Sequence, residues 1–121
     1  MNQRQRTGRQ GEAIATEYLL AQGCTILETN WHAAAAEIDI VCRCQDTLVF
    51  VEVRTSRTGD VTKALSSLTP GKQTRLVRSV YAYLDAYQTP EGQNWRIDVI
   101  AVALQSDGKP IIEHVEDALG W

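Results

Sequence analysis

The sequence predicts an α/β domain whose mixed sheet is covered by helices, in the order αβββαββ. Two segments carry apolar residues at helical spacing, and five shorter segments carry the alternating or apolar pattern of strands. Helical and strand patterns are interspersed along the chain, which is typical of layered α/β folds. No repeat, linker or low-complexity stretch interrupts the 121 residues. We therefore expect a single domain, residues 1–121.

The first half of the chain is predicted to form one helix and three strands. The helix spans about 9–22, where apolar residues recur at helical spacing and Gly23 ends the pattern. The strand segments are 24–30, 37–44 and 47–55. A short polar turn around Gln45 and Asp46 joins the last two, so these two strands should form a hairpin.

The second half begins with a polar connection, residues 56–68, and continues with a helix. Thr69 and Pro70 favour a helix start, because a capping hydroxyl precedes a proline at the first helical position. The apolar positions of this helix form one stripe: Leu76, Val77, Val80, Tyr83, Leu84 and Tyr87. Strands are expected at 93–104 and 110–115, around a turn at 106–110.

Composition excludes several classes of protein. No apolar run approaches the roughly 20 residues that cross a bilayer, and the polar, arginine-bearing first ten residues lack the core of a signal peptide. A cytoplasmic protein without a membrane partner is expected. Walker, dinucleotide-binding, nucleophile-elbow and zinc motifs are all missing from the sequence.

The cysteines are odd in number and lack metal-type spacing: Cys24, Cys42 and Cys44. Cys42 and Cys44 should share one face of a strand. They could be redox-active or metal-binding, but the favoured interpretation is that they are packed, reduced thiols.

The formal net charge of −3 hides a basic region. Between Arg54 and Arg78 there are six basic residues and one acid, and Arg4, Arg6 and Arg9 add a basic N-terminal segment. Such a run is either a solvated face or a nucleic-acid contact. The connection that carries Arg57 and Lys63 is correspondingly either a substrate-contacting flap or an ordinary surface loop.

The hairpin predicts a pair of opposed carboxylates. A turn centred between Gln45 and Asp46 places Asp39 opposite Glu52 and Glu37 opposite Arg54. The same register pairs Ile38 with Val53 and Ile40 with Val51, while Phe50 shares the face of Glu52 and Arg54.

Opposed carboxylates repel each other and destabilise a sheet, unless a divalent cation such as Mg²⁺ binds both. Arg54 could then stabilise charge on a phosphate, and metal-activated attack of water on a phosphodiester is the natural chemistry. The alternative is an exposed strand with a simple Glu37–Arg54 ion pair, and a bulge would separate Asp39 from Glu52.

Several motifs in the right order resemble the bacterial YraN family of uncharacterised proteins. They are GRQGEAIATEYLLAQG (8–23), EID (37–39), VFVEVR (49–54), LTPGKQTRL (68–76) and WRIDVIAV (95–102). The resemblance spans about residues 8–104. It implies a restriction-endonuclease-like fold, because that family looks like a branch of the PD-(D/E)xK nucleases, related to archaeal Holliday-junction resolvases.

Carried over residue by residue, the resemblance implies a nuclease-type metal and nucleic-acid site. Asp39 and Glu52 would hold Mg²⁺ or Mn²⁺, Arg54 would stand where the superfamily usually has lysine, and Glu12 matches an acid near the metal. The residues expected to contact the nucleic-acid backbone are Arg57, Lys72, Gln73 and Arg75. A homodimer is also implied, because resolvase relatives form two-fold dimers.

Two departures from the family pattern matter. Arg54 is always charged and cannot act as a general base, although it can neutralise a phosphate. Ala36 replaces a glycine that usually precedes the Glu-Ile-Asp motif, so a positive φ there would strain the turn.

The sequence thus favours a nucleic-acid-binding protein with metal-dependent endonuclease activity on DNA, including branched DNA. The main alternative is an inactive nucleic-acid-binding or scaffold protein that retains the nuclease fold. A protein-interaction module without a nucleic-acid role leaves the opposed acids unexplained.

Overall fold

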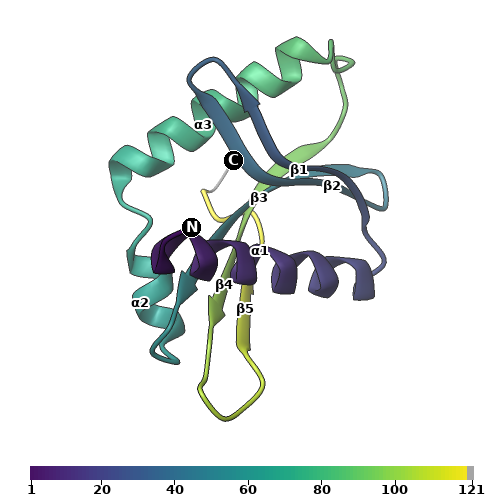
Figure 1. Ribbon diagram of the computed structural model, residues 1–121. Coiled ribbons are helices and arrows are strands. Elements are labelled where there is room, and N and C mark those ends of the chain that lie inside the picture. The colour runs from purple at the N-terminus through teal and green to yellow at the C-terminus, as the bar shows by residue number, and fades with distance from the viewer. Residues whose placement is uncertain (120–121) are drawn as a thin grey trace.

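The computed structural model describes residues 1–119, which form one five-stranded sheet with helices packed against it (Figure 1). In chain order the elements are α1 (Gln3–Ala21), β1 (Thr25–Ala33), β2 (Ala36–Cys44), β3 (Thr47–Ser56), α2 (Val61–Ser66), α3 (Pro70–Ala86), β4 (Trp95–Ala103) and β5 (Ile111–Val115). The predicted order αβββαββ is confirmed, with the short helix α2 added inside the 56–68 connection. Within residues 1–119, none of the helices is both long and apolar enough to cross a membrane.

The strands lie in the sheet in the order in which they occur in the chain, from β1 to β5. Strands β3 and β4 are parallel, and every other neighbouring pair is antiparallel. The predicted mixed sheet is therefore confirmed. A parallel pair needs a crossover connection, which α2 and α3 supply between β3 and β4.

Alternate residues of β3 enter two different hydrophobic cores. Val49, Val51 and Val53 pack with Ala15 and Leu19 of α1. Leu48 and Phe50 point the other way, into a cluster with these residues of α3: Leu76, Val80 and Tyr83. Because successive side chains of a strand point to opposite faces, α1 and α3 cover opposite faces of the sheet.

Local capping explains where the two long helices begin. Thr69 caps α3 and Pro70 is its first residue, as predicted. Helix α1 begins six residues earlier than the apolar pattern indicates, because Asn2 and Gln5 form a capping box in which each side chain bonds to the other's backbone. This longer helix carries the arginines of the basic N-terminal segment.

The interpretation of the cysteines as reduced thiols is wrong for two of the three. Cys24 and Cys44 form a disulfide, while Cys42 is a free, buried thiol. The physical reason is strand pairing: Thr25 of β1 lies opposite Arg43 of β2, which brings the residue before Thr25 next to the residue after Arg43. That contact depends on how β1 pairs, which the spacing of the cysteines does not reveal.

Candidate functional site

The hairpin of β2 and β3 follows the predicted register only as far as Ile40. The paired residues run from Cys44 opposite Thr47 to Ile40 opposite Val51. Beyond that point the carboxylate of Asp39 accepts a hydrogen bond of 2.8 Å from the backbone N–H of Val53. The side chain of Asp39 thus accepts the hydrogen bond that the backbone of β2 would otherwise have accepted from Val53.

The two strands separate at Asp39, so part of the predicted pairing is wrong. Ile40 packs on the α1 side of the sheet, whereas Ile38 packs on the α3 side. The chain therefore rotates between them. Three predicted pairs fall outside the ladder: Asp39 with Glu52, Ile38 with Val53 and Glu37 with Arg54. Glu37 instead lies 3.4 Å from His32 of β1.

Asp39 and Glu52 nevertheless remain in contact. Burial, the charge of Asp39 and a hydrogen bond with Asp39 raise the pKa of Glu52 to about 8. Burial also raises the pKa of Asp39, although the N–H of Val53 and the bond from Glu52 oppose that rise. The hydrogen bond between them raises the pKa of Glu52 and lowers that of Asp39, so Glu52 is the donor and Asp39 the acceptor. The side chain of Glu52 is only 17% exposed.

Arg54 is held beside this pair by two hydrogen bonds. One guanidinium nitrogen lies 3.2 Å from Glu52 Oε2, and Nε donates to Ser67 Oγ at 2.8 Å. Ser67 follows α2 and donates in turn to the carbonyl of Ala64. The connection between β3 and α3 therefore fixes the direction in which Arg54 points.

Glu12 reaches Asp39 from the opposite side, on α1. Burial and the charge of Asp39 raise its pKa, and it shares hydrogen bonds with Asn30 and Asp39. The preceding residue, Gly11, lets the helix approach β3 closely, because a Cβ there would overlap the side chain of Thr55. Glu12, Asp39 and Glu52 are still not a compact triad: within residues 1–119, the one trio of donor atoms found within 4.8 Å of one another comes from cysteines.

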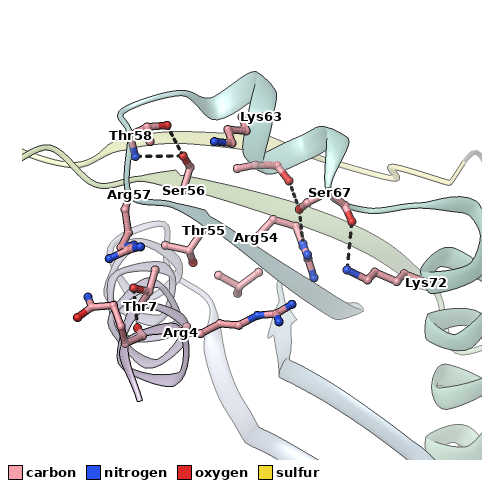
Figure 2. Close-up of a pocket in the computed structure, with 14 residues that line it drawn as sticks. Arg4, Thr7, Arg54, Thr55, Ser56, Arg57, Thr58, Lys63, Ser67 and Lys72 are labelled. Atoms are coloured by element: carbon pink, nitrogen blue, oxygen red, sulfur yellow. Dashed lines mark hydrogen bonds between the residues drawn. The ribbon is translucent and has the colours of Figure 1, made fainter. Parts of the chain in front are cut away.

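A basic cavity of about 920 Å³ opens next to Arg54 (Figure 2). Five cationic side chains line it: Arg4, Arg54, Arg57, Lys63 and Lys72. Hydroxyl groups line it as well, from Thr7, Thr55, Ser56, Thr58 and Ser67, and its lining contains no acidic residue. The cavity lies between α1, the end of β3 and α2, and it offers positive charge and hydrogen-bond donors to an anion.

A smaller cavity of about 380 Å³ lies beside Glu52 of the carboxyl pair. It is lined by Glu52, Arg54, Lys72 and Arg75, among others. Arg54 and Lys72 line both cavities. Gln73 lines neither of them, and its side-chain amide donates to the carbonyl of Leu68 at 3.1 Å. Of the four residues expected to contact nucleic acid, three thus border a cavity and Gln73 secures the start of α3.

Sequence reasoning did not assign Arg4 or Ser67 to the site. Arg4 reaches the cavity because α1 extends to Gln3, and the capping residues Asn2 and Gln5 were the signal that could have placed it there. Ser67 orients Arg54 through a contact 13 residues away in the chain. Its sequence neighbourhood carries no signal of that role.

Comparison with known proteins places these residues within a family. The model of the uncharacterised protein family UPF0102 matches residues 11–102. A UPF0102 protein of Roseiflexus castenholzii is 41% identical over 96% of this chain and 94% of its own length. One from Herpetosiphon aurantiacus is 44% identical over 93% of each chain. These matches confirm the family resemblance noted from the motifs.

Among solved structures, the SfsA protein of Pyrococcus furiosus in complex with Ca²⁺ is similar, with a TM-score of 0.37 and 14% identity. The match covers 93% of this chain and 63% of that one. This similarity is too low to transfer any feature of that protein.

Proposed function

This chain belongs to the UPF0102 family, and we propose that it is a divalent-metal-dependent endonuclease that cleaves DNA phosphodiesters. The observation that carries the proposal is the carboxyl pair of Asp39 and Glu52. Two adjacent, largely buried acids share a hydrogen bond; burial raises the pKa of both, and the charge of Asp39 raises that of Glu52 further. Such an arrangement costs stability, so a plain structural hairpin gains nothing from it.

The donor chemistry of the pair suits Mg²⁺ or Mn²⁺. Both groups are carboxyls, and hard cations of this kind take oxygen ligands from one or two carboxylates. Binding would displace the proton between the two acids, and the cation would offset the repulsion between the two carboxylates that result. When bound, the cation supplies Lewis-acid polarisation of a phosphate oxygen and a lowered pKa for an attacking water.

The remaining residues of the site would stabilise charge on the phosphate and hold the nucleic-acid backbone in position. Arg54 carries a permanent charge beside Glu52 and can stabilise negative charge that develops on the phosphate. Lys72 and Arg75 border the same cavity and can hold the flanking backbone. Glu12, which bonds to Asp39 from α1, orients that carboxylate. A nucleic-acid strand would leave this position along the basic cavity (Figure 2).

One observation favours a second candidate, a nucleic-acid-binding protein without turnover. Arg54 occupies the place where related nucleases usually have lysine, and its guanidinium is bonded to Glu52 and Ser67. It therefore cannot take a proton from water. The basic cavity and nucleic-acid binding would be retained in that case, while cleavage would not. The homodimer implied by the resemblance stays a prediction for either candidate.

The two candidates are separated by a cleavage assay. Linear duplex, single-stranded and four-way-junction DNA are incubated with Mn²⁺ or with EDTA, using the wild type, Asp39→Asn and Glu52→Gln. The exposed Glu113→Gln on β5 is the matched control. We expect Mn²⁺-dependent cleavage that both site variants lose and the control keeps. Binding without cleavage under every condition would instead support the second candidate.

A further inference from the structure

Three cysteine side chains converge on the α1 side of the sheet, apart from the carboxyl pair. Cys24 lies between α1 and β1, and Cys42 and Cys44 are two residues apart on β2, on the same face. The sulfur atoms of the three lie within 4.8 Å of one another. Cys42 Sγ is 3.8 Å from Cys44 Sγ, and Cys44 is bonded to Cys24.

The disulfide does not account for the third sulfur. A covalent link between β1 and β2 needs two cysteines, and any small apolar residue would fill the place of the buried Cys42.

The spacing of the sulfurs fits a soft metal ion. Tetrahedral zinc sites have Zn–S bonds of about 2.3 Å, so their sulfurs lie about 3.8 Å apart. Cys42 and Cys44 already have this separation. When the disulfide is reduced, the sulfurs of Cys24 and Cys44 can move apart to van der Waals contact. That separation is similar to the distance between two sulfurs in a tetrahedral zinc site. Cys44 is partly exposed while Cys24 and Cys42 are buried, so the cluster is reached from the side of Cys44.

We propose that Cys24, Cys42 and Cys44, when reduced, form a thiolate site for Zn²⁺, with the fourth position open on the side of Cys44. Each thiol loses its proton to solvent on binding, because a coordinated thiol is deprotonated by the cation. The disulfide and the metal-bound state exclude each other. Reduction by a phosphine requires one water: the disulfide takes up two electrons and two protons, and the phosphine becomes its oxide.

Cobalt substitution tests this site without any assay of cleavage. Protein reduced with a phosphine is titrated with Co²⁺, and the sulfur-to-cobalt charge-transfer band and the visible bands of tetrahedral Co²⁺ are recorded. We expect the bands to saturate at one equivalent, to be displaced by Zn²⁺, and to be absent from the oxidised protein. The double variant Asp39→Asn/Glu52→Gln should keep them, so this site and the carboxyl site can fail independently.

Three single variants identify the ligands: Cys24→Ser, Cys42→Ser and Cys44→Ser. Each should weaken Co²⁺ binding at least tenfold, with circular dichroism used to verify folding. If Cys42→Ser does not fold, the partly exposed Cys44→Ser decides the outcome. The proposal is overturned if the reduced wild type gives no charge-transfer band, or if the band persists unchanged in a folded serine variant.

Discussion

At Asp39 a carboxylate, and not the backbone of the neighbouring strand, completes the hydrogen bonding of β3. Its oxygen accepts from the N–H of Val53, while Glu52 and Glu12 approach it from the two faces of the sheet. Because β2 and β3 separate at this point, the side chain of Asp39 can contact both Glu52 and Glu12. The site therefore depends on an irregularity of the strand pairing.

A second buried acid, Asp98 on β4, shows the contrasting case of a fully satisfied carboxylate. It is completely buried. Its oxygens accept hydrogen bonds from Arg96 at 2.9 Å and from the backbone of Asp117 at 3.0 Å, and they lie 2.7 Å from His114 Nε2. Burial alone would raise its pKa, but the bonds from His114, Arg96 and Asp117 outweigh burial and lower it.

Replacing Asp98 with asparagine should lower the free energy of unfolding by about 3–5 kcal/mol, because it removes the buried carboxylate that pairs with Arg96. Urea unfolding at pH 7 measures the change. Glu116→Gln is the matched control, since that exposed carboxylate lies 3.9 Å from the same arginine and should contribute little. An equal loss of unfolding free energy in the two variants would contradict the conclusion that the buried Asp98 is the main partner of Arg96.

The lowered pKa of Asp98 also predicts a pH dependence. A carboxyl whose folded pKa lies below its ordinary value of 3.8 stabilises the fold fully above that value. Its contribution is lost as the pH falls through the folded pKa. The stability gap between wild type and Asp98→Asn should therefore shrink as the pH falls from about 4 toward the folded pKa of Asp98. A gap that grew at acid pH would rule this out.

At the scale of elements, the turn between β1 and β2 contains a strained alanine. Ala34 has a φ of +50°, whereas Ala36, where the family pattern has glycine, lacks a positive φ. The left-handed conformation costs an L-residue about 1–2 kcal/mol. The strain expected from the missing glycine thus lies two residues earlier, inside the hairpin turn.

Ala34→Gly should raise the free energy of unfolding by roughly 0.5–1 kcal/mol, because relief of the strain exceeds the extra chain entropy of glycine. Ala36→Gly, in β2, should lower it by at least a similar amount, because glycine adds chain entropy and removes a methyl group that packs against the core on the α3 side. Thermal or urea unfolding of the two variants side by side measures both shifts. A loss of stability in Ala34→Gly would show that the turn is not strained.

A feature could be predicted from the sequence where residues next to it in the chain determine it, and could not where distant residues do. The start of α3 follows from Thr69 and Pro70 alone, and the register of β2 and β3 near the turn follows from two residues of that turn. The rotation of β2 between Ile38 and Ile40 could not be predicted from neighbouring residues. It arises because Ile38 packs against α3, an element more than 30 residues further along the chain.

At the scale of the whole molecule, the basic cavity is assembled from distant parts of the sequence. Arg4 comes from α1, Arg54 from β3 and Lys63 from α2 (Figure 2). The sequence showed the excess of basic residues but not that these side chains surround one opening. Likewise, it placed Asp39 near Glu52 but gave no sign of the disulfide, because the pairing of β1 decides which cysteines meet.

If this cavity binds the nucleic-acid backbone, removing its charges should reduce the salt dependence of binding. Each lost phosphate contact lowers the slope of log K against log salt by about 0.9 for duplex DNA. The triple variant Arg4→Gln/Arg57→Gln/Lys63→Gln should therefore have a clearly smaller slope than wild type in a fluorescence-anisotropy titration. The charge-matched control is Arg6→Gln/Arg78→Gln/Lys109→Gln, three positions outside the cavity. Equal slopes in the two triple variants would place the binding surface elsewhere.

The claim on which the proposed function depends most is that Asp39 and Glu52 together hold a divalent cation. Electron paramagnetic resonance of free Mn²⁺ measures this directly, because the signal of the aqueous ion disappears when the protein binds it. The wild type and Glu113→Gln should each bind one Mn²⁺, whereas Asp39→Asn and Glu52→Gln should bind it at least tenfold more weakly. Unchanged Mn²⁺ binding in both site variants would contradict the claim.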